Sequence, residues 1–293
     1  MPLKDCKPNE DRCCGHSIFL FLKYLIQMKQ LYLFFLLICQ LGIAQSVTLE
    51  GKVPFVADKF IGFDNYKNAF FIKDRVLKKQ GPDGNFLFND LQLGRITSVD
   101  IINPLKVIAF FQDTNTVVML DNKLNEIERI NFNNLPQFLN VSTATNAGSN
   151  SLWLFNVDTQ QLEMYNYGSK LQTVVSQPFP GKLLSQASNF NYCFALTEKK
   201  LRAFNIYGSI LNEVPSENYE KIVQQNENLI ALKQNALYYL PDFAKRNETL
   251  NHKSVQLKLP EITIKDLQLT NDFLYIYDGE NLHTFKLTIP TKE

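Results

Sequence analysis

The sequence has few residues of the types that carry metal, redox or nucleophilic chemistry. Of its 293 residues, 5 are Cys, 3 are His and 1 is Trp. After residue 45 only Cys193 remains, in the apolar run "YCFAL", so it has no partner for an internal disulfide. Free cysteine is among the most buried residue types, and we expect Cys193 to lie in the core.

Recognisable catalytic motifs are also absent. Residues 46–293 contain no GxSxG, HExxH or P-loop motif. His252 and His283 stand far apart in the chain, and they provide neither a triad nor a pair of ligands at metal-binding spacing. These absences argue against an enzyme but leave the question open.

The sequence also lacks an excess of charge of either sign. Lys and Arg number 30, against 29 Asp and Glu, which gives a formal net charge of +1. Proteins that hold nucleic acid by its phosphates carry a basic excess, so we expect no nucleic-acid partner. What is abundant is apolar and aromatic: 45% of residues are hydrophobic, with 23 Phe and 12 Tyr, which predicts a sizeable core rather than disorder.

Residues 28–44 read as a secretory signal peptide. Lys29 is followed by the apolar stretch Leu31–Cys39, and the small residues Gly42 and Ala44 precede the expected cleavage point. The apolar core is shorter than the ~20 residues that a membrane-spanning helix needs. We therefore expect export to the periplasm, the cell surface or the medium, with no integral membrane span in the mature chain.

Residues 1–27 lie in front of this signal, and we interpret them as an upstream extension that arises if Met28 is the true start. If Met1 is the start, the apolar segments 18–26 and 31–44 could instead merge into one membrane anchor. The cysteines and the histidine before residue 17 lack the paired CxxC spacing of zinc sites. Cys39 follows Ile38 rather than a small residue, which disfavours lipid modification.

From residue 46 onward the chain repeats with a period near 40 residues. Six apolar runs align with one another: "AFFIKDRVL" from 69, "AFFQDTNTVVML" from 109, "LFNVDTQQLEMY" from 154, "FALTEKKLRAF" from 194, "IALKQNALYYL" from 230 and "LYIYDGENLHTF" from 274. Each is a strand, a turn and a second strand. A shorter strand precedes each run, a further strand follows most of them, and helical periodicity is absent.

Such a repeat, made only of strands, predicts an all-β, six-bladed β-propeller with four antiparallel strands per blade over residues 46–293. The sixth unit stops before its fourth strand. "SVTLEGKV", residues 46–53, precedes the first unit and is left over. Because an unpaired edge exposes backbone hydrogen-bonding groups, we expect this N-terminal strand to close the last blade.

The segments "IINPLKVIAFFQDTNTVVMLDNKLNE" and "LWLFNVDTQQLEMYN" also resemble uncharacterised secreted propeller proteins of flavobacterial type. That resemblance implies a family without an assigned activity. The Gly-His and Trp-Asp pairs of WD40 blades and the Tyr-Trp-Thr-Asp signature of receptor propellers are missing.

Candidate site residues come from the turn between the second and third strand of each unit. One polar residue recurs there in the same register: Asp74, Asp113, Asp158, Glu198, Gln234 and Asp278. A ring of these acids could form a binding face that holds a cation such as calcium, or that contacts a polyol or peptide by accepting hydrogen bonds. Arg95, in a loop near the expected channel, could bind an anion, although a solvated loop arginine is the stronger reading. Asp and Asn also favour tight β-turns without any ligand, and this reading is the stronger one. Trp153 aligns with other aromatic residues of the repeat, and we expect it in the core.

The leading functional hypothesis is a non-catalytic, monomeric binding or scaffold module for a protein or cell-envelope partner, without a cofactor. Loops of variable length on a rigid ring support it. The alternative is a hydrolase or lyase that acts on a sugar or lactone with a calcium ion in the channel.

Overall fold

A computed structural model describes residue 29 and residues 46–148, 150–245 and 254–288. The described residues from Ser46 onward belong to one compact unit. The predicted upstream extension (1–27) and signal peptide (28–44) lie outside the described residues, apart from Lys29. Within the described part of the chain, no helix is long and apolar enough to cross a membrane.

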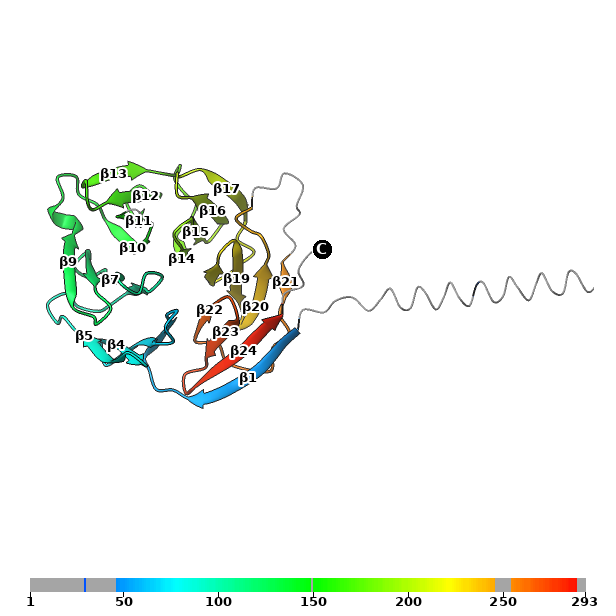
Figure 1. Cartoon of the computed structure of the whole chain (residues 1–293). Coiled ribbons are helices and arrows are strands. Elements are labelled where there is room, and N and C mark those ends of the chain that lie inside the picture. Colours follow the sequence, from blue (N-terminus) through cyan, green and yellow to red (C-terminus); the bar gives the residue numbers. More distant parts are fainter. Residues whose placement is uncertain (1–28, 30–45, 149, 246–253, 289–293) are drawn as a thin grey trace, which may run out of the picture. The chain divides into compact units, whose positions relative to one another are not determined.

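The fold is all-β, with six separate four-stranded antiparallel sheets arranged as the blades of a ring (Figure 1). Blade 1 contains β2 (Lys59–Phe63), β3 (Ala69–Lys73), β4 (Val76–Gly81) and β5 (Gly84–Phe88). Blade 2 contains β6 (Ser98–Asp100), β7 (Val107–Phe111), β8 (Thr116–Leu120) and β9 (Glu126–Asn131). Blade 3 contains β10 (Val141–Asn146), β11 (Ser151–Asn156), β12 (Gln161–Asn166) and β13 (Leu171–Val174).

Blade 4 contains β14 (Leu183–Ser188), β15 (Tyr192–Thr197), β16 (Lys200–Asn205) and β17 (Ile210–Pro215). Blade 5 contains β18 (Lys221–Gln225), β19 (Asn228–Lys233), β20 (Ala236–Leu240) and β21 (Val255–Gln256). Blade 6 contains β22 (Asp266–Leu269), β23 (Phe273–Tyr277), β24 (Asn281–Thr288) and, as its outermost strand, β1 (Ser46–Pro54). The predicted six-bladed propeller is therefore confirmed. From Ser46 on, the described residues form no α-helix and one 3-10 turn, η1 (Phe132–Asn134).

Closure of the ring follows the prediction. β1 pairs antiparallel with β24, from Ser46 opposite Thr288 to Pro54 opposite Asn281, with a register shift between Leu49 and Gly51. The N-terminal strand thus gives blade 6 its fourth strand and covers the edge that β24 would otherwise expose.

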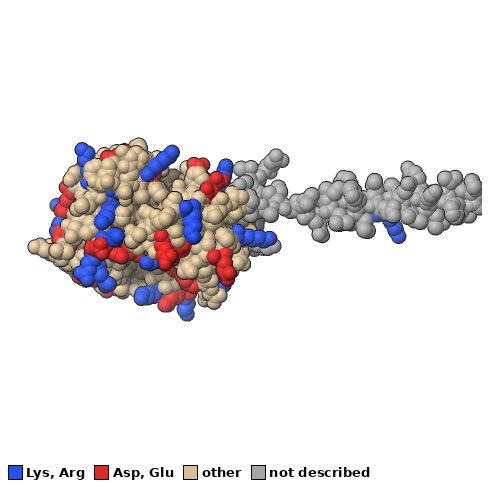
Figure 2. Space-filling model, turned by 90° about the horizontal axis from the view of Figure 1, so that it is seen from below, with Lys and Arg blue, Asp and Glu red and all other residues tan. Residues whose placement is uncertain are grey.

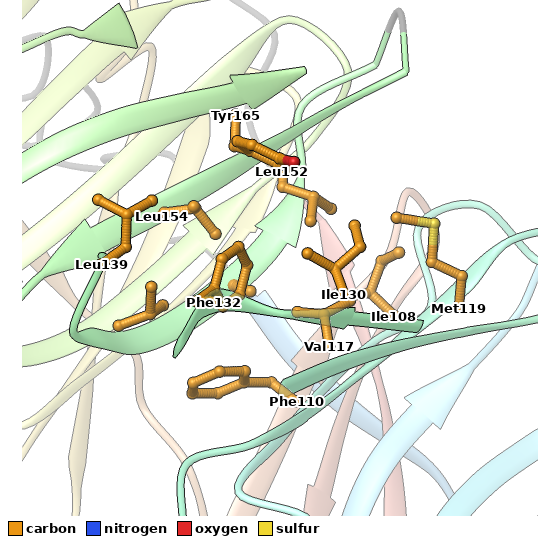
Figure 3. Close-up of a cluster of buried hydrophobic side chains, with 12 residues drawn as sticks. Ile108, Phe110, Val117, Met119, Ile130, Phe132, Leu139, Leu152, Leu154 and Tyr165 are labelled. Atoms are coloured by element: carbon orange, nitrogen blue, oxygen red, sulfur yellow. The ribbon is translucent and has the colours of Figure 1, made fainter. Parts of the chain in front are cut away.

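The core lies between the blades, because the second strand of each blade is apolar on both faces. In β7, "VIAFF", every residue is buried. Ile108 and Phe110 pack against blade 3, whereas Val107, Ala109 and Phe111 pack against blade 1. Figure 3 shows the first of these contacts, where Leu152 and Leu154 of β11 face the side chains of blade 2. One such cluster of buried side chains joins each pair of neighbouring blades.

Trp153 and Cys193 belong to the cluster between blades 3 and 4. Both are fully buried, together with Phe155 and Phe179, whose rings meet edge to face with centroids 5.6 Å apart. The expectation that both are core residues is confirmed. Burial raises the pKa of the Cys193 thiol well above its ordinary value, so the thiolate that would react is disfavoured.

Candidate functional site

The loops that connect the strands lie at two opposite ends of the ring. We name the strands of a blade A to D, from the innermost to the outermost. Because consecutive strands alternate in direction, the B–C and D–A loops lie at one end of the ring, called here the BC end. The A–B and C–D loops lie at the other, called the AB end. The strand order is the same in all six sheets, so this division holds all round the ring.

The predicted acidic residues all lie in B–C turns, as the alignment of repeats indicated. Asp74 lies between β3 and β4, Asp113 between β7 and β8, Asp158 between β11 and β12, Glu198 between β15 and β16, and Asp278 between β23 and β24. Strand B is the second strand from the centre, and none of these side chains is among those that line the central cavity described below.

Several of these acids bond to the neighbouring D–A loop. Asp158 Oδ1 accepts a hydrogen bond from Asn140 Nδ2 at 2.7 Å. Asp113 Oδ2 lies 3.4 Å from the backbone N of Arg95 and 4.0 Å from its Nε, with both side chains largely exposed. An exposed pair at this separation contributes little to stability. These contacts join the B–C turn of a blade to the D–A loop that leads into it.

Glu198 and Asp74 also form hydrogen bonds with the D–A loop that leads into their own blade. Glu198 Oε2 accepts from the backbone N of Lys182 at 3.3 Å. Asp74 has a positive φ of 55°, as its neighbour in the two-residue turn does, and its N–H donates to Asp58 at 2.7 Å. Positive φ is typical of tight hairpin turns, and Asp and Asn tolerate it better than most residues.

Asp278 has the densest set of contacts of the five. Its carboxylate accepts from the backbone N–H groups of Glu280 and Asn281 at 2.8 and 2.6 Å, and Oδ2 lies 2.7 Å from Nε2 of buried His283. Burial opposes ionisation, but the hydrogen bonds from His283, Asn281 and Glu280 outweigh it and lower the pKa of Asp278.

A cavity of about 320 Å³ occupies the centre of the ring, lined by the A strands of all six blades. Much of its wall is polar. The polar residues that line it include Lys59, Ser98, Asp100, Gln186, Lys221 and Gln224. Among the described residues, no group of three or more His, Cys, Asp or Glu side chains is placed to hold a metal ion.

Polar side chains on the A strands join each blade to the next around this cavity. The A strands of neighbouring blades belong to separate sheets and share no backbone ladder. The bridging contacts, each 2.6 to 3.0 Å long, are Lys59 Nζ to Thr97 O, Asp100 Oδ2 to Asn146 N, Ser188 Oγ to Asn146 O, Gln224 Nε2 to Ser188 O, Lys221 Nζ to Asp266 Oδ1 and Gln268 Nε2 to Phe63 O. We call this set the inter-blade belt.

Two further hydrogen bonds accompany the belt contact between blades 6 and 1. Gln268 also accepts from the backbone N of Phe63 at 2.7 Å, so its amide forms a two-point contact with one residue. Gly62 makes this possible: its φ is 151°, and a Cβ there would lie 2.5 Å from Cδ of Gln268. Asp266 adds a contact from Oδ2 to the backbone N of Phe60 at 3.1 Å.

Asp100 joins blades 2 and 3. Its two oxygens accept from the backbone N–H groups of Ile102 at 2.9 Å and Asn146 at 2.6 Å. Burial nevertheless raises the pKa of Asp100 to about 6, although both N–H donors oppose the rise. This carboxyl therefore titrates near neutral pH within the wall of the cavity.

Two polar atoms of residues that line the cavity have no hydrogen-bond partner among the described residues. They are Oγ of Ser98 and Oε1 of Gln186, and less than 1 Å² of each is exposed. Nε2 of the same glutamine is used, because it donates to Oγ1 of Thr145 at 2.8 Å. Buried polar atoms normally have a partner, so these two sites have capacity for a further hydrogen bond.

The cavity residues were not predicted as site residues. A weak signal for them exists, because β14 (LLSQAS), β18 (KIVQQ) and β22 (DLQL) carry Ser, Gln, Lys or Asp in strands that are otherwise apolar. Alternation of polar and apolar residues places one set on each face of a strand. The sequence does not show that the polar sets of six strands meet in one cavity.

Comparison with known proteins supports the architecture. No protein-family model and no curated protein sequence matches the chain. Among solved structures, the virginiamycin B lyase from Staphylococcus aureus is 11% identical with a TM-score of 0.56, over 83% of this chain and 100% of that one. A chain of the Mitotic Checkpoint Complex is 10% identical with a TM-score of 0.59, over 85% and 94%. The Neurospora crassa Pan2 WD40 domain is 9% identical with a TM-score of 0.53, over 80% and 76%. At these identities the likeness shows the propeller fold alone.

Proposed function

We propose that the chain is an exported, non-catalytic propeller that binds a protein or cell-envelope partner through the AB end of its ring. The observation that carries the proposal is a set of large apolar side chains exposed on the loops of that end. They are Tyr66, Leu105, Phe190 and Tyr207, with 59%, 62%, 45% and 86% of their surface exposed. Tyr and Phe are enriched at protein interfaces, where they bury much area at a small entropic cost.

These residues come from three blades, so a partner seated on the AB end would contact several of them together. Tyr66, Leu105 and Phe190 lie in the A–B loops of blades 1, 2 and 4, and Tyr207 lies in the C–D loop of blade 4. The loops are held rigidly. Asp64 accepts from the backbone N–H groups of Tyr66 and Asn68, both at 2.9 Å, and so fixes the turn that presents Tyr66. A rigid loop loses little freedom on binding.

Charge gives no support to a nucleic-acid partner. Basic and acidic side chains are interspersed on the side of the ring seen in Figure 2, with uncharged surface between them. Export remains a prediction from the signal-like segment 28–44, as does the likeness to secreted flavobacterial propellers. The alternative, a calcium-dependent hydrolase or lyase, rests on the B–C acids and is an outcome of the test below.

The test is crosslinking and capture from cell-envelope extracts with the mature chain as bait. Replacement of Tyr66, Phe190 and Tyr207 by Ser should abolish capture of the partner. A matched variant replaces the exposed Val56, Leu91 and Phe138, which lie in D–A loops at the BC end, and should retain it. If the AB-end variant still captures the partner and the BC-end variant does not, the partner binds at the BC end and the proposal is wrong. Capture that requires calcium and fails when Asp113 and Asp158 are both replaced by Asn would favour the alternative.

A further inference from the structure

The central cavity opens at the AB end of the ring, where uncharged amide side chains line it. Gln225 is the last residue of β18, Asn271 lies in the loop between β22 and β23, and Asn65 lies in the loop between β2 and β3. All three line the cavity, and Asn65 and Asn271 are exposed. We call these three residues the AB mouth. Because exposed side chains line the cavity here, a ligand can reach them from solvent.

The acids that line this part of the cavity are already occupied. Asp64 lies 3.8 Å from the ammonium of Lys79 and accepts from two backbone N–H groups. Asp100 also accepts from two backbone N–H groups. The groups that remain for a ligand at the AB mouth are therefore neutral amides, which favours an uncharged ligand.

Hydrogen bonds between side chains fix how the amides of the AB mouth are turned. Gln225 Nε2 donates to Asn271 Oδ1 at 2.6 Å, and Asn226 Nδ2 lies 3.5 Å from the same oxygen. Nδ2 of Asn271 and Oε1 of Gln225 have no partner in the described part of the chain. One is a donor with two N–H groups and the other is an acceptor. Two neighbouring amides thus present one free donor group and one free acceptor.

The same network reaches blade 4 and the exposed ring of Phe190. Asn189 Nδ2 donates to the backbone O of Asn226 at 3.2 Å. Asn189 Oδ1 accepts from two backbone N–H groups of its own loop, both at 2.9 Å, and so holds the turn that presents Phe190. The face of an aromatic ring is negative, and the C–H groups on one side of a sugar ring pack against it. Phe190 therefore offers a sugar a surface beside the amides.

An acetamido group matches the free atoms of the AB mouth. Its N–H would donate to Gln225 Oε1, and its carbonyl oxygen would accept from Asn271 Nδ2. A hydroxyl group has a single oxygen for both bonds, whereas an acetamido group has two atoms set apart, as the amides of the mouth have. The cavity volume of about 320 Å³ lies at the lower end of the range for small-molecule sites, ~300–1,000 Å³, which suits one end of a sugar chain.

We propose that the AB mouth binds an uncharged oligosaccharide that carries acetamido groups, with one acetamido group on Gln225 and Asn271 and a neighbouring sugar ring on Phe190. This inference rests on the proposed function, because it uses the same end of the ring and names the envelope partner as a glycan. A folded protein would rest on the loop tips, whereas a sugar unit can enter the cavity and reach Gln225.

The experiment is titration calorimetry of the mature chain with chitotriose, three linked N-acetylglucosamine units. Cellotriose is the comparison probe, because it has the same length and linkage and carries a hydroxyl group in place of each acetamido group. Chitotriose should bind. Cellotriose should bind at least about tenfold more weakly, the loss expected when a donor or acceptor of a site is left without its partner.

Asn271→Asp tests the amide donor of the AB mouth. It keeps the acceptor oxygen for Gln225 and replaces Nδ2 by a second oxygen, so chitotriose binding should fall at least about tenfold. The matched control is Asn85→Asp, which adds the same charge on an exposed side chain of the outer strand β5 and should bind chitotriose as the unmodified chain does. Phe190→Ala should also weaken chitotriose. Trp153 emission verifies that each variant is folded.

The proposal is overturned if chitotriose does not bind, if cellotriose binds as tightly, or if Asn271→Asp and Asn85→Asp behave alike. Each of these results leaves the proposed function intact when capture from cell-envelope extracts still requires Tyr66, Phe190 and Tyr207. Capture of a protein by the unmodified chain and by Asn271→Asp alike, without chitotriose binding, would assign the AB end to a protein partner instead of a glycan.

Discussion

The ammonium group of Lys79 lies 3.8 Å from the carboxylate of Asp64 inside blade 1, and at most 1% of either side chain is exposed. Lys79 Nζ also donates to the backbone O of Asn122 at 2.9 Å, which joins the outer part of blade 1 to blade 2. Its ammonium lies 5.7 Å from the ring centroids of Phe70 and Phe86. It also lies 3.4 Å from the carboxylate of Asp83, which is half exposed. A buried cation is thus surrounded by two carboxylates, a carbonyl and two aromatic faces.

Lys79→Met should be strongly destabilising, because it leaves Asp64 buried without its counter-charge. The expected loss in the free energy of unfolding is about 3–5 kcal/mol. Urea titration measures it, with the adjacent, less buried Lys78→Met as control. Adding Asp64→Asn to Lys79→Met should recover part of the loss. Equal stability of Lys79→Met and Lys78→Met would contradict the importance of the pair.

Asp100 should give the protein a stability step between pH 4 and 6. Its pKa is about 6 in the fold and near 3.8 in the unfolded chain, so the folded state binds the proton more tightly. The contribution of this group is therefore fully present below about pH 4 and is lost as the pH rises through 6. Melting temperatures across this range, compared between the unmodified chain and Asp100→Asn, measure the step. If the difference between the two does not change with pH, Asp100 does not titrate there.

Asp278 should act with the opposite sign at lower pH. Because hydrogen bonds lower its pKa in the fold, its contribution is present above the ordinary value of 3.8 and is lost as the pH falls below it. Asp278→Asn should remove that acid-range loss while leaving the step of Asp100 unchanged. Acid unfolding followed by circular dichroism checks the prediction, and an unchanged acid transition in the variant would contradict it.

Trp153 should report unfolding by its fluorescence. It is the single tryptophan of the chain and is fully buried, so its emission should shift to longer wavelength as the protein unfolds. Trp153→Ala leaves a cavity between blades 3 and 4 and should cost about 3–5 kcal/mol of unfolding free energy. Trp153→Phe fills most of that space and should cost less. Urea titration followed by circular dichroism compares the two, and similar losses would mean that the site collapses around either side chain.

Deletion of residues 46–53 should lower the melting temperature substantially, because it removes most of the pairing with β24. Replacement of the exposed β1 side chains Leu49 and Val53 by Ser keeps the backbone ladder and should change stability by no more than about 0.5 kcal/mol. Calorimetry of the two variants separates pairing from side-chain packing. An unchanged melting temperature after the deletion would show that closure by β1 is dispensable.

The sequence predicted the blades because each repeat has a B strand, such as VIAFF in β7, that is apolar on both faces and so must lie between two layers. It predicted closure because one strand was left over at one end and one was missing at the other. It also placed the acids in B–C turns correctly. It could not show that Asp158 reaches Asn140 or that Asp113 stands beside Arg95, because these contacts depend on how a D–A loop folds back.

The cavity could be predicted least. Lys59, Lys221 and Asp266 belong to blades 1, 5 and 6, and nothing in their local sequences links them. Their proximity results from the closure of the ring, which sets the angle between blades through the inter-blade clusters and the belt. The orphaned oxygen of Gln186 likewise becomes visible only when the side chains around it are placed.

The pairing of β1 with β24 also determines the order in which the molecule can assemble. Tyr277 of β23 donates to the backbone O of Ala57 across 220 residues of chain, and β1 meets β24 over a comparable separation. During synthesis from the N-terminus, β1 is made before the other strands, and its partner β24 is made after them. Contacts of such long range slow folding. Until β24 is present, the unpaired edge of β1 can pair with other chains. The extent of aggregation during folding should therefore depend on how soon β24 pairs with β1.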